Sequence, residues 1–239
     1  MAENHTPTLI TQTHPKSAAA EAFRTLRTNI SFSALDRPVQ SLLVTSAGPG
    51  EGKSTTTCNL AVVMAQTGSR VLVLDCDLRK PTMHKVFDLD NRRGLTSVLV
   101  EGLDPAEVIS PTLAAGLSVL TSGPLPPNPA ELLGSGRMRD LLARLVAEHD
   151  IVLIDTPPVL AVTDAAVLAP QVDAAVLVAR AGVTRLDMMQ EAKTSLGKTG
   201  VHLLGAVLNG LRPESDGYYY YYHYKYYYGQ HNGEGNNRG

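Results

Sequence analysis

The residues best suited to chemistry lie in a glycine-rich run at residues 46–55, which reads SAGPGEGKST. Glycines let successive backbone N–H groups converge on one phosphate, because no Cβ stands in the way. In such a loop Lys53 would reach the β- and γ-phosphates of a nucleotide, and the Ser54 hydroxyl would bind Mg²⁺. We therefore predict that a nucleoside triphosphate is bound by Gly48, Pro49, Gly50, Glu51, Gly52, Lys53, Ser54 and Thr55.

The segments on either side of this run fit a strand and a helix. Residues 41–45 form an apolar run of the size of a buried strand, and residues 56–66 place apolar side chains at helical spacing before Gly68. The amino end of that helix would add partial positive charge at the phosphate. Ala47 stands where the usual pattern has its first glycine. An ordinary strand-to-helix turn is the alternative, and the three remaining glycines, the Lys-Ser pair and the flanks weigh against it.

Two further apolar runs end in carboxylates. Residues 71–74 lead into Asp75 and Asp77, and residues 151–154 lead into Asp155. In open parallel sheets ligands bind beyond the carboxyl ends of the strands, so these aspartates are expected beside the phosphate loop. Asp75 and Asp77 would point to one side of the strand, where two like charges call for a cation. Each aspartate alone could be an ordinary residue at a strand end, but together they predict Mg²⁺ bound by Ser54, Asp75 and Asp155.

Apolar strands and amphipathic helices alternate along most of the chain. We expect further strands at residues 117–120, 174–179 and 203–208, and helices at 95–100, 130–148, 164–168 and 185–196. Strands that are apolar throughout imply a parallel sheet covered on both faces. The predicted fold class is therefore α/β, a three-layer P-loop NTPase fold with a mostly parallel central sheet. The domain would span residues 17–211, preceded by a disordered stretch at 1–16 and followed by a flexible tail at 212–239.

Composition limits the possible classes of function. The 239 residues are 44% hydrophobic and carry a formal net charge of −2, which argues against nucleic-acid binding through a broad basic face. No apolar run approaches the roughly 20 residues that span a bilayer, and residues 1–17 lack the apolar segment of a secretory signal. Cys58 and Cys76 fit small buried side chains in a reducing compartment better than a disulfide or a metal pair. We therefore expect a cytoplasmic protein.

Two further features each leave an alternative open. The predicted helix at residues 17–33 carries Glu21, Arg24 and Arg27 three positions apart, and this spacing alone favours a solvated face with weak ion pairs. Asn209 follows the last predicted strand, where its side-chain amide could bind the edge of an adenine. An asparagine that forms a turn explains the residue equally well.

The aromatic residues are unevenly distributed. All nine tyrosines lie between residues 218 and 228, whereas the rest of the chain has only three phenylalanines. No aliphatic residue follows Leu211, so the tail cannot form a core. The tyrosines therefore need an explanation other than packing, and they are Tyr218, Tyr219, Tyr220, Tyr221, Tyr222, Tyr224, Tyr226, Tyr227 and Tyr228.

Taken together, these motifs resemble the bacterial tyrosine kinase family, which adapts a P-loop ATPase domain of the MinD/ParA type to phosphorylate its own C-terminal tyrosines. The resemblance rests on the phosphate loop, on the strand ends at residues 73–79 and 153–158, and on the tyrosine block at 218–228. It implies ATP and Mg²⁺ as cofactors and the nine tyrosines as phosphorylation sites. The catalytic residues expected on this basis are Lys53, Asp75, Asp77 and Asp155. Asp77 would orient the tyrosine hydroxyl and accept its proton, although Asp75 could exchange roles with it.

The resemblance also implies partners. In this family the pattern Glu21-x-x-Arg24-x-x-Arg27 mediates assembly into a ring, so copies of the chain would phosphorylate one another in trans. A separate membrane-anchored polysaccharide co-polymerase would activate the kinase and recruit it to the inner face of the cell membrane. A phosphotyrosine phosphatase would reverse the modification, and the cycle would regulate the synthesis and export of capsular or exopolysaccharide.

Two other classes of protein stay open at this stage. A ParA/MinD-type ATPase switch explains the loop and the carboxylates but not the tyrosine block. It would commonly carry an additional lysine early in the loop, where this chain has Ser46 and Ala47. The chain also lacks a cysteine pair for the bridging iron–sulfur cluster of related scaffold ATPases. The second alternative is a catalytically idle interaction module whose tyrosines self-associate.

Overall fold

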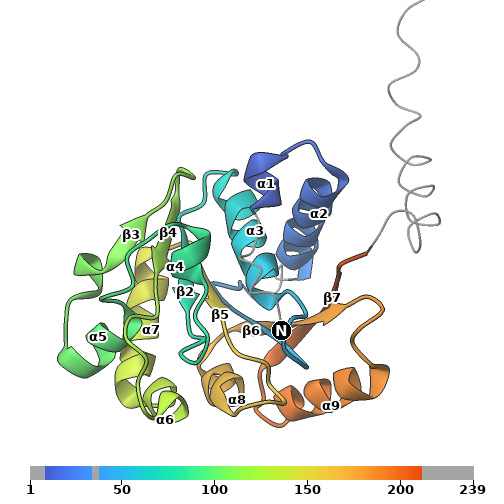
Figure 1. Cartoon of the computed structure of the whole chain (residues 1–239). Helices are drawn as coiled ribbons and strands as arrows, with labels where there is room; N and C mark the ends of the chain where they lie inside the picture. Colours follow the sequence, from blue (N-terminus) through green and yellow to red (C-terminus); the bar gives the residue numbers. More distant parts are fainter. Residues whose placement is uncertain (1–8, 34–37, 212–239) are drawn as a thin grey trace, which may run out of the picture.

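The computed structural model describes residues 9–33 and 38–211, and its centre is one seven-stranded sheet (Figure 1). The strand order is β3-β4-β2-β5-β1-β6-β7, and all neighbours are parallel except β3 and β4 at one edge. The strands are β1 (Ser41–Ser46), β2 (Val71–Asp75), β3 (Ile109–Pro111), β4 (Leu117–Leu120), β5 (Ile151–Asp155), β6 (Ala174–Arg180) and β7 (His202–Asn209).

Helices cover both faces of this sheet (Figure 1). The α-helices are α1 (Ile10–Thr13), α2 (Ala18–Ser33), α3 (Lys53–Ala65), α4 (Met83–Val86), α5 (Leu95–Glu101), α6 (Pro129–Leu133), α7 (Gly136–Glu148), α8 (Asp164–Leu168) and α9 (Leu186–Gly197). Two 3-10 turns, η1 (Pro105–Glu107) and η2 (Ala169–Gln171), complete the described elements. The predicted α/β class, with three layers and a mostly parallel sheet, is confirmed.

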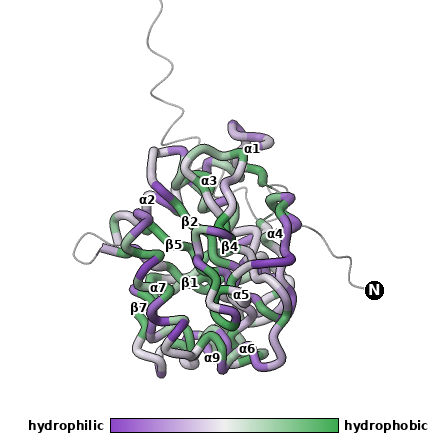
Figure 2. The backbone as a smooth tube through the Cα atoms, turned by 90° about the vertical axis from the view of Figure 1, so that its left-hand side faces the viewer, coloured by the Kyte–Doolittle hydropathy of each residue, from purple (hydrophilic) through white to green (hydrophobic). Residues whose placement is uncertain are grey.

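Successive residues of the central strands face opposite layers of the core. Leu42 and Val44 of β1 belong to the cluster that contains α2 and α3, whereas Leu43 between them belongs to the cluster that contains α5, α7, α8 and α9. This division follows from the period of two in side-chain direction along a strand. Figure 2 shows that apolar segments gather in the strands at the centre of the molecule.

The structure corrects part of the prediction for residues 1–16. Residues 9–16 are not disordered, because α1 packs against α3 and Thr11 is fully buried there. The Thr11 backbone N–H and hydroxyl both donate to Asn59 Oδ1, at 3.0 and 2.9 Å. One polar anchor therefore fixes a segment that has no apolar period. Residues 1–8 and the predicted tail at 212–239 lie outside the described residues.

The predicted helix at residues 130–148 is two helices, and β3 and α4 were not predicted. Gly134 follows α6, and the Ser135 side chain caps α7 by accepting a hydrogen bond from the Met138 N–H at 3.2 Å. Serine at this position satisfies an amide that the first turn leaves without a partner. Cys58 and Cys76 are buried free thiols, as expected. Over the described ranges, no helix is both long and apolar enough to cross a membrane.

A substitution at Gly94 should destabilise the fold strongly. A Cβ at Gly94 would overlap the carbonyl oxygen of Thr121 and the amide nitrogen of Gly123, which are backbone atoms and cannot swing aside. We expect Gly94→Ala to lower the free energy of unfolding by about 3 kcal/mol, at the upper end of overpacking costs. Chemical denaturation would measure this loss. Gly136→Ala is the matched control, because nothing lies within 4 Å of its Cβ position, and an equal loss in both variants would contradict the explanation.

Candidate functional site

The phosphate loop joins β1 to α3 at the carboxyl edge of the sheet. Gly50 and Gly52 have φ angles of +74° and +96°, which favour glycine. A Cβ at Gly52 would in addition overlap the side-chain amide nitrogen of Asn209. Ala47 is buried with an ordinary φ angle, so the missing first glycine does not disturb the loop.

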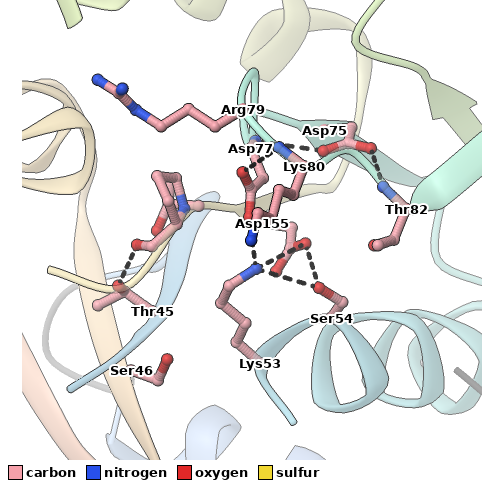
Figure 3. A network of polar contacts seen from close by, with 12 residues as sticks. Thr45, Ser46, Lys53, Ser54, Asp75, Asp77, Arg79, Lys80, Thr82 and Asp155 are labelled. Carbon is pink, nitrogen blue, oxygen red and sulfur yellow. Dashed lines mark hydrogen bonds and ion pairs between the residues drawn. The ribbon is translucent and has the colours of Figure 1, made fainter. Parts of the chain in front are cut away.

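Lys53, the first residue of α3, lies among carboxylates that follow β2 and β5 (Figure 3). Its Nζ donates to Asp77 Oδ2 at 2.8 Å and lies 3.8 Å from Asp155 Oδ2. Burial alone would lower the pKa of Lys53, but the charges of Asp155 and Asp77 outweigh it, and the pKa is raised. The lysine is therefore a buried cation held by two carboxylates.

Asp155, the last residue of β5, contacts the start of α3. The Ser54 hydroxyl donates to Asp155 Oδ2 at 2.6 Å, and the Thr57 hydroxyl lies 3.5 Å from Asp155 Oδ1. Burial raises the pKa of Asp155, while Lys53 and the Ser54 hydroxyl act in the opposite direction. The structure therefore brings together Ser54 and Asp155, two of the three residues predicted to bind Mg²⁺.

Asp75 of β2 is paired with Asp155 of β5 in the sheet, and its carboxylate accepts hydrogen bonds from backbone amides. One carboxylate oxygen accepts the Asp77 N–H at 3.2 Å, and the other accepts the N–H groups of Thr82 and Met83 at 3.1 and 3.0 Å. Burial and the charge of Asp155 nevertheless raise the pKa of Asp75 to about 7. Asp75 is therefore better placed to shape the loop after β2 than to contact a ligand directly, and its predicted catalytic and metal-binding roles stay predictions.

The donor set at Ser54 and Asp155 fits Mg²⁺. This ion prefers hard oxygen ligands and is usually bound through one or two carboxylates, waters and substrate phosphates rather than by a cage of side chains. A hydroxyl and a carboxylate oxygen 2.6 Å apart supply such ligands next to the phosphate loop. Among the described residues, no group of three or more His, Cys, Asp or Glu side chains is arranged to hold a metal by itself. Ser54 and Asp155 would hold the ion.

Asn209, at the end of β7, lies against the phosphate loop. Its Nδ2 donates to the carbonyl oxygen of Glu51 at 3.1 Å, and its Oδ1 accepts the Gly210 N–H at 2.8 Å. The predicted contact of Asn209 with an adenine is untested and stays a prediction.

Arg79 lies in the motif at residues 73–79, but its partner was not predicted from the sequence. Arg79, after β2, forms a bidentate pair with Asp164 of α8, with Nη2 3.0 Å from Oδ2, and the Asp164 side chain is fully buried. The pair joins the loops that follow β2 and β5. Asp164 is an acidic residue in the first turn of a helix, which is a recognisable position, but its partner Arg79 lies 85 residues away in sequence.

The predicted oligomerisation residues lie on α2. Arg24 pairs with Glu21 at 2.7 Å and donates to the Pro15 carbonyl oxygen, and Arg27 donates to the Val63 carbonyl oxygen of α3 at 2.8 Å. These contacts are within the chain, so the predicted ring is not tested by them. The nine predicted phosphorylation sites, between residues 218 and 228, lie outside the described residues.

Removal of the Arg79 guanidinium should destabilise the protein. Arg79→Ala would leave the buried Asp164 carboxylate without its ion pair, and we expect a loss of about 2 kcal/mol in the free energy of unfolding. Arg92→Ala is the control, because Arg92 and Asp90 form an exposed pair and such pairs contribute little. Equal unfolding midpoints in urea for Arg79→Ala and the unchanged protein would refute this role for the buried pair.

Comparisons with known proteins agree with this geometry. Residues 41–179 match the AAA domain family. The tyrosine-protein kinase YwqD of Bacillus subtilis strain 168 is 48% identical over 213 residues, which cover 89% of this chain and 90% of that protein. The solved kinase domain of the Escherichia coli tyrosine kinase ETK has a TM-score of 0.82 and 38% identity, and the match covers 85% of this chain and 80% of that one.

A less similar solved structure shows the wider group of folds to which the chain is similar. The septum site-determining protein MinD of Pyrococcus horikoshii, complexed with Mg-ADP, has a TM-score of 0.62 and 25% identity. That match covers 71% of this chain and 69% of MinD. The chain therefore belongs to the bacterial tyrosine kinase family, a group of protein-tyrosine kinases built on a MinD-like P-loop fold.

Proposed function

We propose that the protein is an ATP-dependent autokinase that transfers the γ-phosphoryl group of ATP to its own tyrosines between residues 218 and 228. The observation that carries this proposal is the cluster of Lys53, Asp77 and Asp155 beside the phosphate loop. The names of YwqD and ETK as tyrosine kinases support the reaction, and the Mg-ADP complex of MinD supports the nucleotide.

Each group at this edge would have one task. Backbone N–H groups of the loop would bind the phosphates, and Lys53 would turn from Asp77 and Asp155 toward the charge that develops as the γ-phosphoryl group leaves. Mg²⁺, held by Ser54 and Asp155, would neutralise phosphate charge when bound. Phosphoryl transfer of this kind depends mainly on positioning and electrostatics, which a preformed set of buried charges provides.

Asp77 is the better of the two candidates for the residue that accepts the tyrosine proton. The Asp75 carboxylate is fully buried and accepts three backbone N–H groups. Asp77 bonds to Lys53 and accepts the Lys80 N–H at 3.0 Å, so a turn of the lysine toward phosphate would release one of its oxygens. A free tyrosine has a pKa near ~10 and a free aspartate near ~3.9, so the proton would move late in the reaction.

The length of the tail allows transfer within one chain or between chains. Tyr218 lies seven positions after Leu211, and an extended chain spans about 3.3–3.6 Å per residue, which gives a reach of about 25 Å to the first tyrosine. We propose that transfer occurs in trans within a ring formed through Glu21, Arg24 and Arg27. Light scattering that finds only monomers of the unphosphorylated protein would contradict the ring.

We also propose that a membrane-anchored polysaccharide co-polymerase activates the kinase and recruits it to the membrane, and that a phosphotyrosine phosphatase reverses the reaction. The resemblance to the family supports this setting, in which the cycle controls the synthesis and export of capsular or exopolysaccharide. Autophosphorylation that stays the same with and without the cytosolic segment of the co-polymerase would exclude activation by that partner.

One mixing experiment tests both the activity and its direction. Lys53→Met keeps the tyrosines but loses the cation at the γ-phosphate, and a second variant replaces all nine tyrosines with phenylalanine but keeps the site. After incubation of the mixture with ATP and Mg²⁺, we expect the Lys53→Met tail to gain mass in steps of about 80 Da. Mass spectrometry of the C-terminal peptide would measure this gain.

Each variant incubated alone is the control, and neither should gain phosphate. Phosphate release from ATP without any labelling of the wild-type tail would favour an ATPase switch of the MinD type. Labelling of the wild-type tail without labelling in the mixture would show transfer within one chain instead.

Loss of the Asp77 carboxylate should slow transfer more than nucleotide binding. We expect Asp77→Asn to lower the rate of tail phosphorylation by about 10²–10⁴-fold, the usual range for a general base. The fold should persist, because one of several clustered negative charges is removed. Quenched-flow labelling would measure the rate, and fluorescence titration the affinity for ADP. The control is Asp140→Asn on the exposed side of α7, and a wild-type rate for Asp77→Asn would exclude it as the base.

A further inference from the structure

Glu51 is an acidic side chain inside the phosphate loop, and it is only 5% exposed. A carboxylate there would repel the phosphates of a nucleotide unless donors of the protein bind it. The structure supplies one donor to each of its oxygens. Oε2 accepts the Gly48 N–H at 3.0 Å, and Oε1 accepts the Thr184 hydroxyl at 2.6 Å. The Glu51 side chain thus links the start of the loop to the segment between β6 and α9.

The Thr184 hydroxyl can donate in only one direction. Its oxygen accepts the Arg180 backbone N–H at 2.7 Å, and the Thr184 N–H donates to the Arg180 carbonyl oxygen at 2.9 Å. Since a hydroxyl has one proton, that proton is left for Glu51. The Arg180 guanidinium reinforces the link, because it donates to the Gly50 carbonyl oxygen at 3.1 Å.

We propose that Glu51 and Thr184 are positioning residues, which hold the phosphate loop in its binding shape before the nucleotide arrives. We call the contacts of Gly48, Glu51 and Thr184 the loop brace. The Gly48 N–H belongs to the brace, so the phosphates would be bound by the N–H groups that follow it in the loop. A loop that is already shaped loses less conformational freedom on binding, and affinity rises accordingly. This inference rests on the proposed binding of ATP.

Two variants of Thr184 separate the hydroxyl from the shape of the side chain. Thr184→Val keeps the shape but removes both the donor to Glu51 and the acceptor of the Arg180 N–H, whereas Thr184→Ser keeps both. For Thr184→Val we expect the Kd for Mg-ADP to rise about tenfold, equivalent to about 1.4 kcal/mol for a bond to a charged group. The KM for ATP should rise similarly, with a smaller change in kcat. Thr184→Ser should bind within about twofold of wild type, since the donor is kept.

The control variant is Thr194→Val, because the Thr194 hydroxyl donates only to the Gln190 carbonyl oxygen within α9 among the described contacts. Its Kd should match that of the wild type. Circular dichroism would check that each variant is folded, and Thr184→Ala would replace Thr184→Val if valine disturbs the turn.

A double-mutant cycle tests whether Thr184 acts through Glu51. Glu51→Ala should weaken Mg-ADP binding, and addition of Thr184→Val to it should change the Kd by less than about twofold, since residues that act as a unit are not additive. A purely structural role of Thr184 would instead give additive losses.

The results distinguish failure of the loop brace from failure of the proposed kinase function. Wild-type affinity in folded Thr184→Val, or additive effects in the cycle, would overturn the brace while tail labelling by the wild type still supports the kinase. Wild-type protein that binds Mg-ADP but never labels its tail would contradict the kinase and leave the brace in place.

Discussion

The site depends on one buried interaction, the contact of the Lys53 ammonium with the carboxylates of Asp77 and Asp155. A lysine loses hydration on burial, and it stays charged because the carboxylates compensate. The carboxylates in turn would repel one another without the lysine. Lys53 comes from α3, Asp77 from the loop after β2 and Asp155 from β5, so the contact also links three parts of the chain.

The parallel sheet is the reason that these charges meet. β5 lies between β2 and β1 and is parallel to both, so their carboxyl ends meet at one edge, and Asp75 and Asp155 lie at paired positions. Contacts farther out then fix the loops that follow the strands. Arg79 joins the loop after β2 to α8, and Asn209 joins the end of β7 to the phosphate loop. The geometry of the site is thus set by strand register first and by loop contacts second.

The sequence predicts the strand ends well because local features determine them. An apolar run followed by Asp75 or Asp155 predicts a strand and also predicts that the aspartate lies at the carboxyl edge of the sheet. Contacts between residues far apart in sequence have no such local pattern. Thr184 lies 133 residues from Glu51, and no sequence pattern pairs the two, although Glu51 stands in the predicted nucleotide-binding loop. Thr11 shows the same limit, since a threonine of α1 that is buried against Asn59 of α3 anchors a segment without apolar periodicity.

The two edges of the sheet differ in charge balance, and this difference explains why the carboxyl edge should bind a cation and an anion together. At the amino edge, Arg70 and Asp150 form an exposed pair in which the charges cancel. At the carboxyl edge, three aspartates face one lysine. Burial and the charge of Asp155 raise the pKa of Asp75, and burial and the charge of Asp77 raise the pKa of Asp155. A bound dication would offset that excess, and Lys53 with the N–H groups of the loop would offset the charge of a polyphosphate.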